Sequence, residues 1–320
     1  MPQAFQQWFP QFAPYFSRIL RDNCSSEYHD FLTLPDPWTN YHANMVVSCI
    51  LGHFDESGKA QLAAASVLLG LLPTILGMVG SNTTEIGLLA LRQPVFAFLL
   101  SLGAPVISPI RSFEYRDPFE LLQLKEDDIR PFLNWRRLLY FVEYLVTFTA
   151  IGNVVHVTWQ LSVSSLCAFS GSSQWLPAFW FGISVIPHFF GAYAVRLRFK
   201  KSDIPIIKAL LDELRFKKEP REVKLVKSPE SKRYLVWSWL ASAATVLHIV
   251  IGTVVLSSAL FISPSDAVVV SLRFFASGVV CRIFLMFELH GMGKFVEPEE
   301  KDTVSTSTGT GQSMKPNRGV

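Results

Sequence analysis

The sequence is poor in charge and lacks recognisable catalytic motifs. Only 17% of its 320 residues are Asp, Glu, Lys or Arg, whereas soluble domains carry about 25%. Its four cysteines, Cys24, Cys49, Cys167 and Cys281, have no CxxC spacing, which argues against a zinc site. No HExxH, GxSxG or Walker pattern is present. We therefore expect no metal, no cofactor, no catalytic residue and no nucleic-acid partner.

What the sequence does contain is apolar residues, which make up 50% of the chain and give a mean hydropathy of +0.30. They gather in runs of about 20 residues, the length of helix that crosses a hydrocarbon layer of about 30 Å. These runs predict an all-α, polytopic membrane protein embedded in a lipid bilayer. Six spans are expected, at 59–79, 85–107, 138–161, 175–195, 235–262 and 266–289.

The second of these spans is the weakest, because Arg92 and Pro94 interrupt it. Its start is well marked: Asn82, followed three residues later by Glu85, resembles a capping box. If 85–107 only re-enters the membrane or lies at its interface, five spans remain. The N-terminus would then lie outside the cytoplasm.

Basic residues are confined to every second loop. The stretch 108–137 holds six and the stretch 196–234 holds thirteen, whereas 80–85, 163–174 and 263–266 hold none. Because basic loops stay in the cytoplasm, six spans place both termini there, in the plasma membrane or an endomembrane. The first 59 residues do not fit this orientation well, because they hold three basic and six acidic residues, an unusual balance for a cytoplasmic segment. The 196–234 loop either binds anionic lipid heads or serves only to set the orientation.

Three regions are expected: an aromatic-rich segment at 1–58, a membrane domain at 59–290, and a disordered tail at 291–320. The N-terminal aromatics either lie in the membrane interface or form a packed cap. Short helices are expected after Asp117 and from Asp203, the second of them basic and amphipathic. Cys24 and Cys49 pair only if this segment is lumenal, and we expect all four cysteines to be reduced.

Ionisable and polar residues inside the spans are costly, so they usually face the bundle and find partners. The candidates are Arg92, Glu143, Asn153, His156, His188, His248, Arg273 and Arg282. Depths estimated from a rise of about 1.5 Å per residue give two layers. We expect a Glu143–Arg282 ion pair in one layer.

In the other layer we expect His156 and His248 near Arg273. The polar stripes of the third and fifth spans should both point inward. Structural pairing between helices is favoured over a proton relay. The three histidines lie at different depths, which argues against a shared metal. No span holds two of them, which argues against haem.

The block AAASVLLGLLPTILGMVGSNTTEIGLLALRQPVFAFLLSLGAPVISPIRSFEYRDP covers the first two predicted spans. It resembles a group of uncharacterised multi-pass membrane proteins of filamentous fungi, with the patterns "ASxVLLGLLPTIL", "GSxTxEIGLL", "LRRPLLA" and "GSPAV". Here Gln93 replaces the second arginine and Ala104 replaces the serine before Pro105. The resemblance implies a fungal membrane protein. It brings no activity and no site residue.

These observations favour a non-enzymatic multi-pass membrane protein, a scaffold or sensor. The alternative is a small transporter or channel, which the breaks at Pro73 and Pro94 and the polar stripes would suit. A membrane-embedded enzyme is the third class, and it has no recognisable catalytic set.

Overall fold

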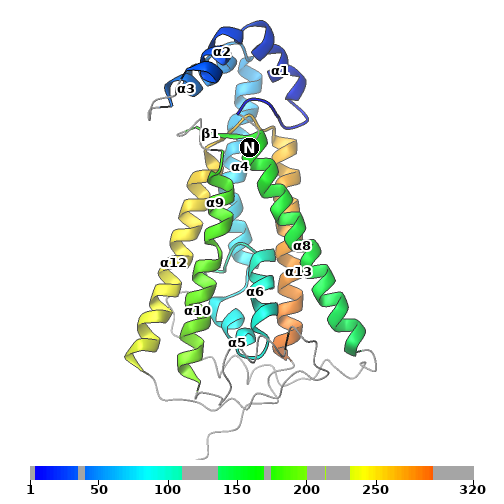
Figure 1. Cartoon of the computed structure of the whole chain (residues 1–320), viewed down its shortest axis with the longest axis vertical. Coiled ribbons are helices and arrows are strands. Elements are labelled where there is room, and N and C mark those ends of the chain that lie inside the picture. Colours follow the sequence, from blue (N-terminus) through cyan, green and yellow to red (C-terminus); the bar gives the residue numbers. More distant parts are fainter. Residues whose placement is uncertain are drawn as a thin grey trace, which may run out of the picture.

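The computed structural model describes residues 4–34, 40–109, 136–168, 174–199, 213 and 231–290. In these ranges the regular elements are helices, apart from two strands of two residues each. Figure 1 shows long helices side by side, with short helices of the N-terminal segment lying across one end. The predicted all-α fold of a polytopic membrane protein is confirmed.

Five helices in the described ranges are long and apolar enough to cross a membrane, counting α9 and α10 as one. They are α4 (Glu56–Val79), α8 (Arg136–Ser164), α9 (Leu176–Ile183) with α10 (Val185–Arg198), α12 (Lys232–Ser257) and α13 (Pro264–His290). Their outer surfaces are apolar: Val67 on α4 is 64% exposed, Leu247 on α12 is 59% exposed and Leu272 on α13 is 60% exposed. Such a surface is costly in water and suits hydrocarbon. The chain is an integral membrane protein.

The predicted second span is two half-helices, α5 (Thr83–Arg92) and α6 (Pro94–Gly103). Pro94 has no N–H and disfavours the helical conformation at the residue before it, and Gln93 accordingly has φ −132° and ψ 77°. Each half-helix is about 15 Å long, half of what a crossing needs. The Ser108 amide donates to the Ser81 carbonyl at 2.9 Å, so the chain returns to where it entered. The alternative of five spans therefore holds, rather than six.

The N-terminal segment is a packed domain of three helices: α1 (Ala13–Asp22), α2 (Ser25–Thr33) and α3 (Tyr41–Gly52). A disulfide joins Cys24, just after α1, to Cys49 in α3. The expectation that all four cysteines are reduced is thus wrong, because helix packing brings these two Cα atoms within 5.9 Å. Cys167 and Cys281 are free and buried.

Aromatic side chains attach this domain to the bundle. The rings of Trp8 and Phe16 lie 5.2 and 5.1 Å from that of Phe261, a fully buried residue that follows strand β2. Strand β2 (Ala259–Leu260) pairs antiparallel with β1 (Leu166–Cys167) between the long helices. Of the two readings of the N-terminal aromatics, the packed cap is confirmed.

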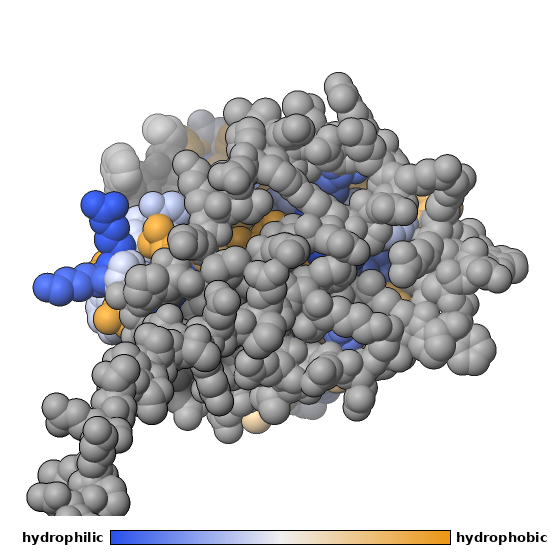
Figure 2. All heavy atoms as spheres, turned by 90° about the horizontal axis from the view of Figure 1, so that it is seen from below, coloured by the Kyte–Doolittle hydropathy of each residue, from blue (hydrophilic) through white to orange (hydrophobic). Residues whose placement is uncertain are grey.

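The bundle therefore has two distinct ends (Figure 1). We call the end that carries α1–α3 the N-terminal end. The opposite end, where α8 and α12 begin and α10 and α13 finish, is called the loop end. Because the N-terminal domain and the last residue of α13 lie at opposite ends, the basis for placing both termini on one face is lost. Seen from the loop end, the described residues show hydrophilic groups beside hydrophobic ones (Figure 2).

Several predictions fall on other parts of the chain. The helix expected after Asp117, the amphipathic helix expected from Asp203 (Glu213 excepted) and the tail from 291 lie outside the described residues.

Candidate functional site in the helix bundle

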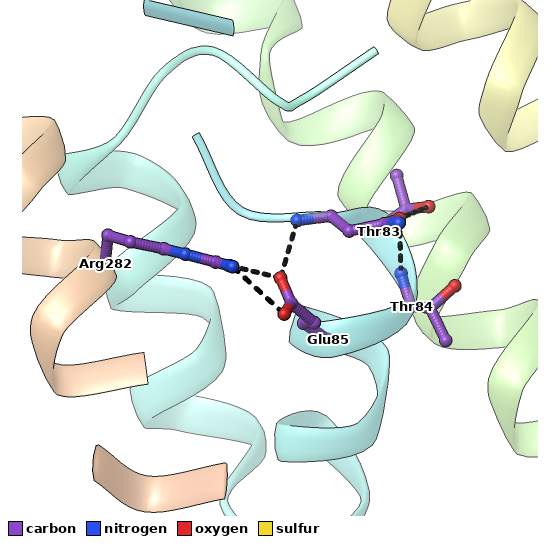
Figure 3. A network of polar contacts seen from close by, with 5 residues as sticks. Thr83, Thr84, Glu85 and Arg282 are labelled. Atoms are coloured by element: carbon purple, nitrogen blue, oxygen red, sulfur yellow. Dashed lines mark hydrogen bonds and ion pairs between the residues drawn. The ribbon is translucent and has the colours of Figure 1, made fainter. Parts of the chain in front are cut away.

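The half-helix hairpin, α5 and α6, is held by charged residues that come from the rest of the bundle. The Glu85 carboxylate on α5 accepts hydrogen bonds from both Nη1 and Nη2 of Arg282 on α13, and the bond from Nη2 is 3.1 Å long. The same carboxylate accepts the Asn82 amide at 3.0 Å, and the Asn82 side chain caps α5 through the Thr84 amide. Figure 3 shows Glu85 between Arg282 and the start of α5. The predicted capping box is confirmed, and its carboxylate is also half of an ion pair between helices.

A second set of polar groups surrounds the break between α5 and α6. Arg92 lies 3.7 Å from the Glu288 carboxylate on α13, and both side chains are at least 96% buried. Gln93 donates to the same carboxylate at 3.1 Å and to the Tyr140 hydroxyl of α8 at 3.4 Å. A buried charge is tolerated only when it is paired and hydrogen-bonded. The break is thus tied to both α8 and α13.

The start of α6 receives a carboxylate from a residue distant in sequence, Glu213, between α10 and α12. Glu213 accepts the amides of Val95 and Phe96, both at 2.9 Å, and the hydroxyl of Tyr144, also at 2.9 Å. The N-terminus of a helix attracts negative charge because its first amides have no partner within the helix. Burial raises the pKa of the Glu213 carboxyl, and the hydrogen bonds that it accepts oppose that rise.

The predicted Glu143–Arg282 pair is wrong. Both residues were placed at similar depth, but depth leaves open which side of a helix a residue faces. Arg282 on α13 faces α5 and binds Glu85. Glu143 on α8 is buried, with 1% of its surface exposed.

The histidines do not form one layer. His248 on α12 donates from Nε2 to the Trp180 carbonyl at 3.0 Å, and Trp180 Nε1 donates back to the His248 carbonyl at 3.3 Å. The two rings are stacked at 5.5 Å. His188 is 3% exposed, and its ring nitrogens have no hydrogen-bond partner among the described residues. The His248 pair joins α9 to α12 and serves as a structural link.

The third predicted member of that layer lies on the outside of the bundle. Arg273 on α13 donates from Nε to Asn153 Oδ1 at 2.8 Å, and its Nη2 lies 3.3 Å from His156 Nδ1. The Asn153 amide donates to Ser277 Oγ at 2.8 Å. His156 is exposed, whereas Asn153 and Arg273 are half-buried. The expected contact between His156 and Arg273 is confirmed, but no contact with His248 accompanies it.

The two polar stripes differ in direction. On the fifth predicted span, Thr245, His248 and Gly252 are buried, so this stripe points inward as expected. On the third predicted span, Gly152 and His156 are exposed, so the expectation of an inward stripe is wrong there. Asn153, at the edge of that stripe, reaches α13.

Sequence reasoning missed four residues that complete these contacts. Glu85 was recognised only as a cap, and Glu288 lies close to the end of its span, where a charge is unremarkable. Gln93 attracted notice only as a departure from a family pattern. Glu213 belongs to a stretch of sequence rich in charge, and no local signal distinguishes it.

The described residues also contain one group with metal-ligand spacing, and a cavity lies in the N-terminal domain. Cys24, Cys49 and His53 lie within 4.8 Å of one another, but the two sulfurs are bonded together and do not form a ligand set in this state. The cavity, of about 440 Å³, lies in the N-terminal domain. Its lining is mostly apolar and includes Phe5, Trp8 and Tyr28.

Searches against protein-family models, curated proteins and solved structures found no match. The function must therefore be argued from the chain's own contacts, and the resemblance to fungal membrane proteins stays a prediction.

Proposed function

We propose that the protein is a non-enzymatic membrane scaffold or sensor. The supporting observation is that two oppositely charged pairs neutralise each other between helices of the bundle: Glu85 with Arg282, and Arg92 with Glu288. Paired in this way they hold helices together, and neither carboxylate is positioned as a general base. The N-terminal domain and most of the basic stretches 108–137 and 196–234 are parts of the chain outside the five long helices. We expect water-soluble partners to bind these parts.

The orientation that we propose places the N-terminal domain outside the cytoplasm. Two independent features support it. Disulfides persist in oxidising compartments, so Cys24–Cys49 favours the lumenal or extracellular side. The basic stretches 108–137 and 196–234 connect helices at the loop end, and basic loops favour the cytoplasm. Five crossings reconcile the two features.

A glycosylation assay tests this orientation. Asn23 begins the sequon Asn23-Cys24-Ser25 and is exposed. In a eukaryotic host we expect a glycan there, seen as a mobility shift that glycosidase treatment reverses and Asn23→Gln abolishes. Asn82 begins a second sequon but caps α5 inside the bundle, so Asn82→Gln should leave the glycan unchanged.

If Asn23 carries no glycan and Cys49 reacts with maleimide in intact cells without reductant, the domain faces the cytoplasm and the proposed orientation fails.

The scaffold role predicts that partner recovery depends on the basic loop. Replacing 214–230 with a Gly-Ser linker of equal length keeps Glu213 and the N-cap of α12, Ser231. Partner recovery in a detergent pull-down should then be lost, while the same replacement at 301–320 should leave it intact. Unchanged recovery after the first replacement would end this version of the proposal. The loop's affinity for anionic lipid can be measured with the same variant on vesicles of anionic and neutral lipid.

A transporter or channel is the second candidate, because half-helices such as α5 and α6 line substrate sites in many transporters. In that case Glu143→Gln or His248→Ala should change flux in reconstituted vesicles while the protein still folds. Wild-type vesicles that show no flux across a broad panel of ions and small solutes would count against this candidate.

A further inference from the structure

The bundle carries a polar surface where lipid should lie. We call it the α8–α13 face. It consists of Thr149, Gly152, Asn153 and His156 on α8, and Arg273 and Ala276 on α13. Thr149, Gly152, His156 and Ala276 are exposed, and Arg273 is half-buried. Figure 1 shows α8 and α13 neighbouring each other along one side of the bundle, and the exposure of these residues means that no described element covers them.

Arg273 lies well inside the membrane segment. It is nine residues from the start of α13, about 14 Å, and seventeen from its end, about 25 Å, at a rise of about 1.5 Å per residue. Ionisable groups at such depth normally pair with an opposite charge. Its hydrogen-bond partners, Asn153 and His156, are uncharged or cationic groups. Within the described residues no carboxylate lies within ion-pair distance of Arg273.

Within the part of the chain that the structure describes, the carboxylates nearest Arg273 along α13 and α8 lie at other depths. Measured along α13 at about 1.5 Å per residue, Asp266 is about 10 Å from Arg273, Arg282 with its partner Glu85 about 13 Å, and Glu288 about 22 Å.

Glu143 on α8 is about 15 Å from Asn153 by the same rise, and it is buried. In a symmetric dimer with its axis along the bundle, every residue keeps its own depth. A second copy in such a dimer therefore brings none of these described carboxylates to the depth of Arg273.

The lack of a carboxylate near Arg273 among the described residues is one observation that points to a partner at this face. The exposed Gly152 is a second, independent one. A Cβ added there meets no atom within 4 Å, so none of the described residues requires a glycine at this position. Thr149 and Ala276 beside it are also small. Small residues on a lipid-facing helix let a second helix approach closely. A lipid headgroup would bind Arg273 without needing this flat strip of small residues.

We propose that the α8–α13 face docks a transmembrane helix of a different protein, one that carries a carboxylate at the depth of Arg273. The carboxylate pairs with the guanidinium, which Asn153 and His156 hold in place, and the helix backbone passes over Gly152. The inference gives the proposed scaffold one class of partner, yet it rests on this face alone and holds or fails separately from the loop's role.

The test uses purified full-length protein in bilayer nanodiscs of phosphatidylcholine. The probe is a fluorescent Leu- and Ala-rich transmembrane peptide with a single Glu about 14 Å from one end of its helix. A matched peptide has Gln at that position. By energy transfer, we expect the Glu peptide to bind the wild-type protein about tenfold more tightly, a difference of about 1.4 kcal/mol.

The variants separate charge from shape. Arg273→Met should remove the preference for Glu over Gln, and Arg273→Lys should keep part of it. Gly152→Leu should weaken both peptides, because its side chain occupies the docking strip. Gly182→Leu is the control: Gly182 on α9 is also exposed, with no atom near an added Cβ, and binding should be unchanged.

Three results would overturn the proposal. Equal affinity of wild-type protein for the Glu and Gln peptides removes the role of charge. Protein dimers in nanodiscs that Gly152→Leu dissociates, counted by single-molecule photobleaching, assign the face to a second copy. A phospholipid that native mass spectrometry finds retained by the wild-type protein and lost from Arg273→Met, without any peptide preference, assigns it to a headgroup.

Discussion

The Glu85–Arg282 pair offers the sharpest test of how the bundle is held together. Arg282→Met removes the charge and keeps most of the side chain's apolar length. It leaves the Glu85 carboxylate, with 9% of its side chain exposed, without the Arg282 guanidinium. Breaking a buried pair by removing one partner costs about 3–5 kcal/mol. Because 26% of the Arg282 side chain is exposed, we expect the lower end, about 3 kcal/mol.

The measurement is reversible unfolding in mixed micelles of mild detergent and dodecyl sulfate. Lys59→Met is the control, because Lys59 pairs with Glu56 at 2.7 Å on a surface where Glu56 is 90% exposed. Such a pair contributes at most about 1 kcal/mol. Adding Glu85→Gln to Arg282→Met removes the unpaired charge and should recover about 1–2 kcal/mol.

If Arg282→Met costs no more than Lys59→Met, the pair does not stabilise the hairpin. If the double variant is less stable than Arg282→Met by the full cost of Glu85→Gln alone, the two residues are not coupled. Either result refutes the reasoning.

Three further predictions concern single contacts. Replacing Cys24 and Cys49 by Ser opens a loop of 25 residues and should destabilise the N-terminal domain by about 3.5 kcal/mol, seen as faster proteolysis of that domain alone. Ser231→Ala removes the side chain that caps α12 and should cost about 1 kcal/mol, and no change in unfolding would contradict that cap. Gly191→Ala places a Cβ 2.9 Å from a backbone oxygen at the start of α5 and should cost about 1–3 kcal/mol, whereas Gly182→Ala, which faces open space, should be nearly neutral.

The sequence predicts the membrane helices well because length and apolar composition are local properties. The limits of the long helices lie within about five residues of those expected. Pro94 indicated the break in 85–107. The number of spans, however, depends on whether this broken segment still crosses the membrane. That question is decided by the hydrogen bond from Ser108 to Ser81, which no hydropathy pattern encodes.

The polar contacts were harder to predict because they depend on which way each helix faces. Depth along a span follows from the sequence, so His156 was placed correctly beside Arg273. The partner of Arg282 was misassigned, because Glu85 lies 197 residues away on a half-helix that was expected to be a full span. The disulfide was misjudged for a related reason: its formation depends on the compartment, and the compartment depends on the number of crossings.

The long distance in sequence between Glu85 and its partner Arg282 also matters during biosynthesis. Glu85 and Arg92 leave the ribosome long before Arg282 and Glu288, the α13 residues that neutralise them. Until α13 is made, Glu85 and Arg92 lack the two α13 residues that neutralise them, and such an incompletely packed state is open to chaperones and proteases. Completion of the last helix is therefore the event that commits the chain to its final form, and a chain truncated before residue 264 should be degraded rather than accumulate.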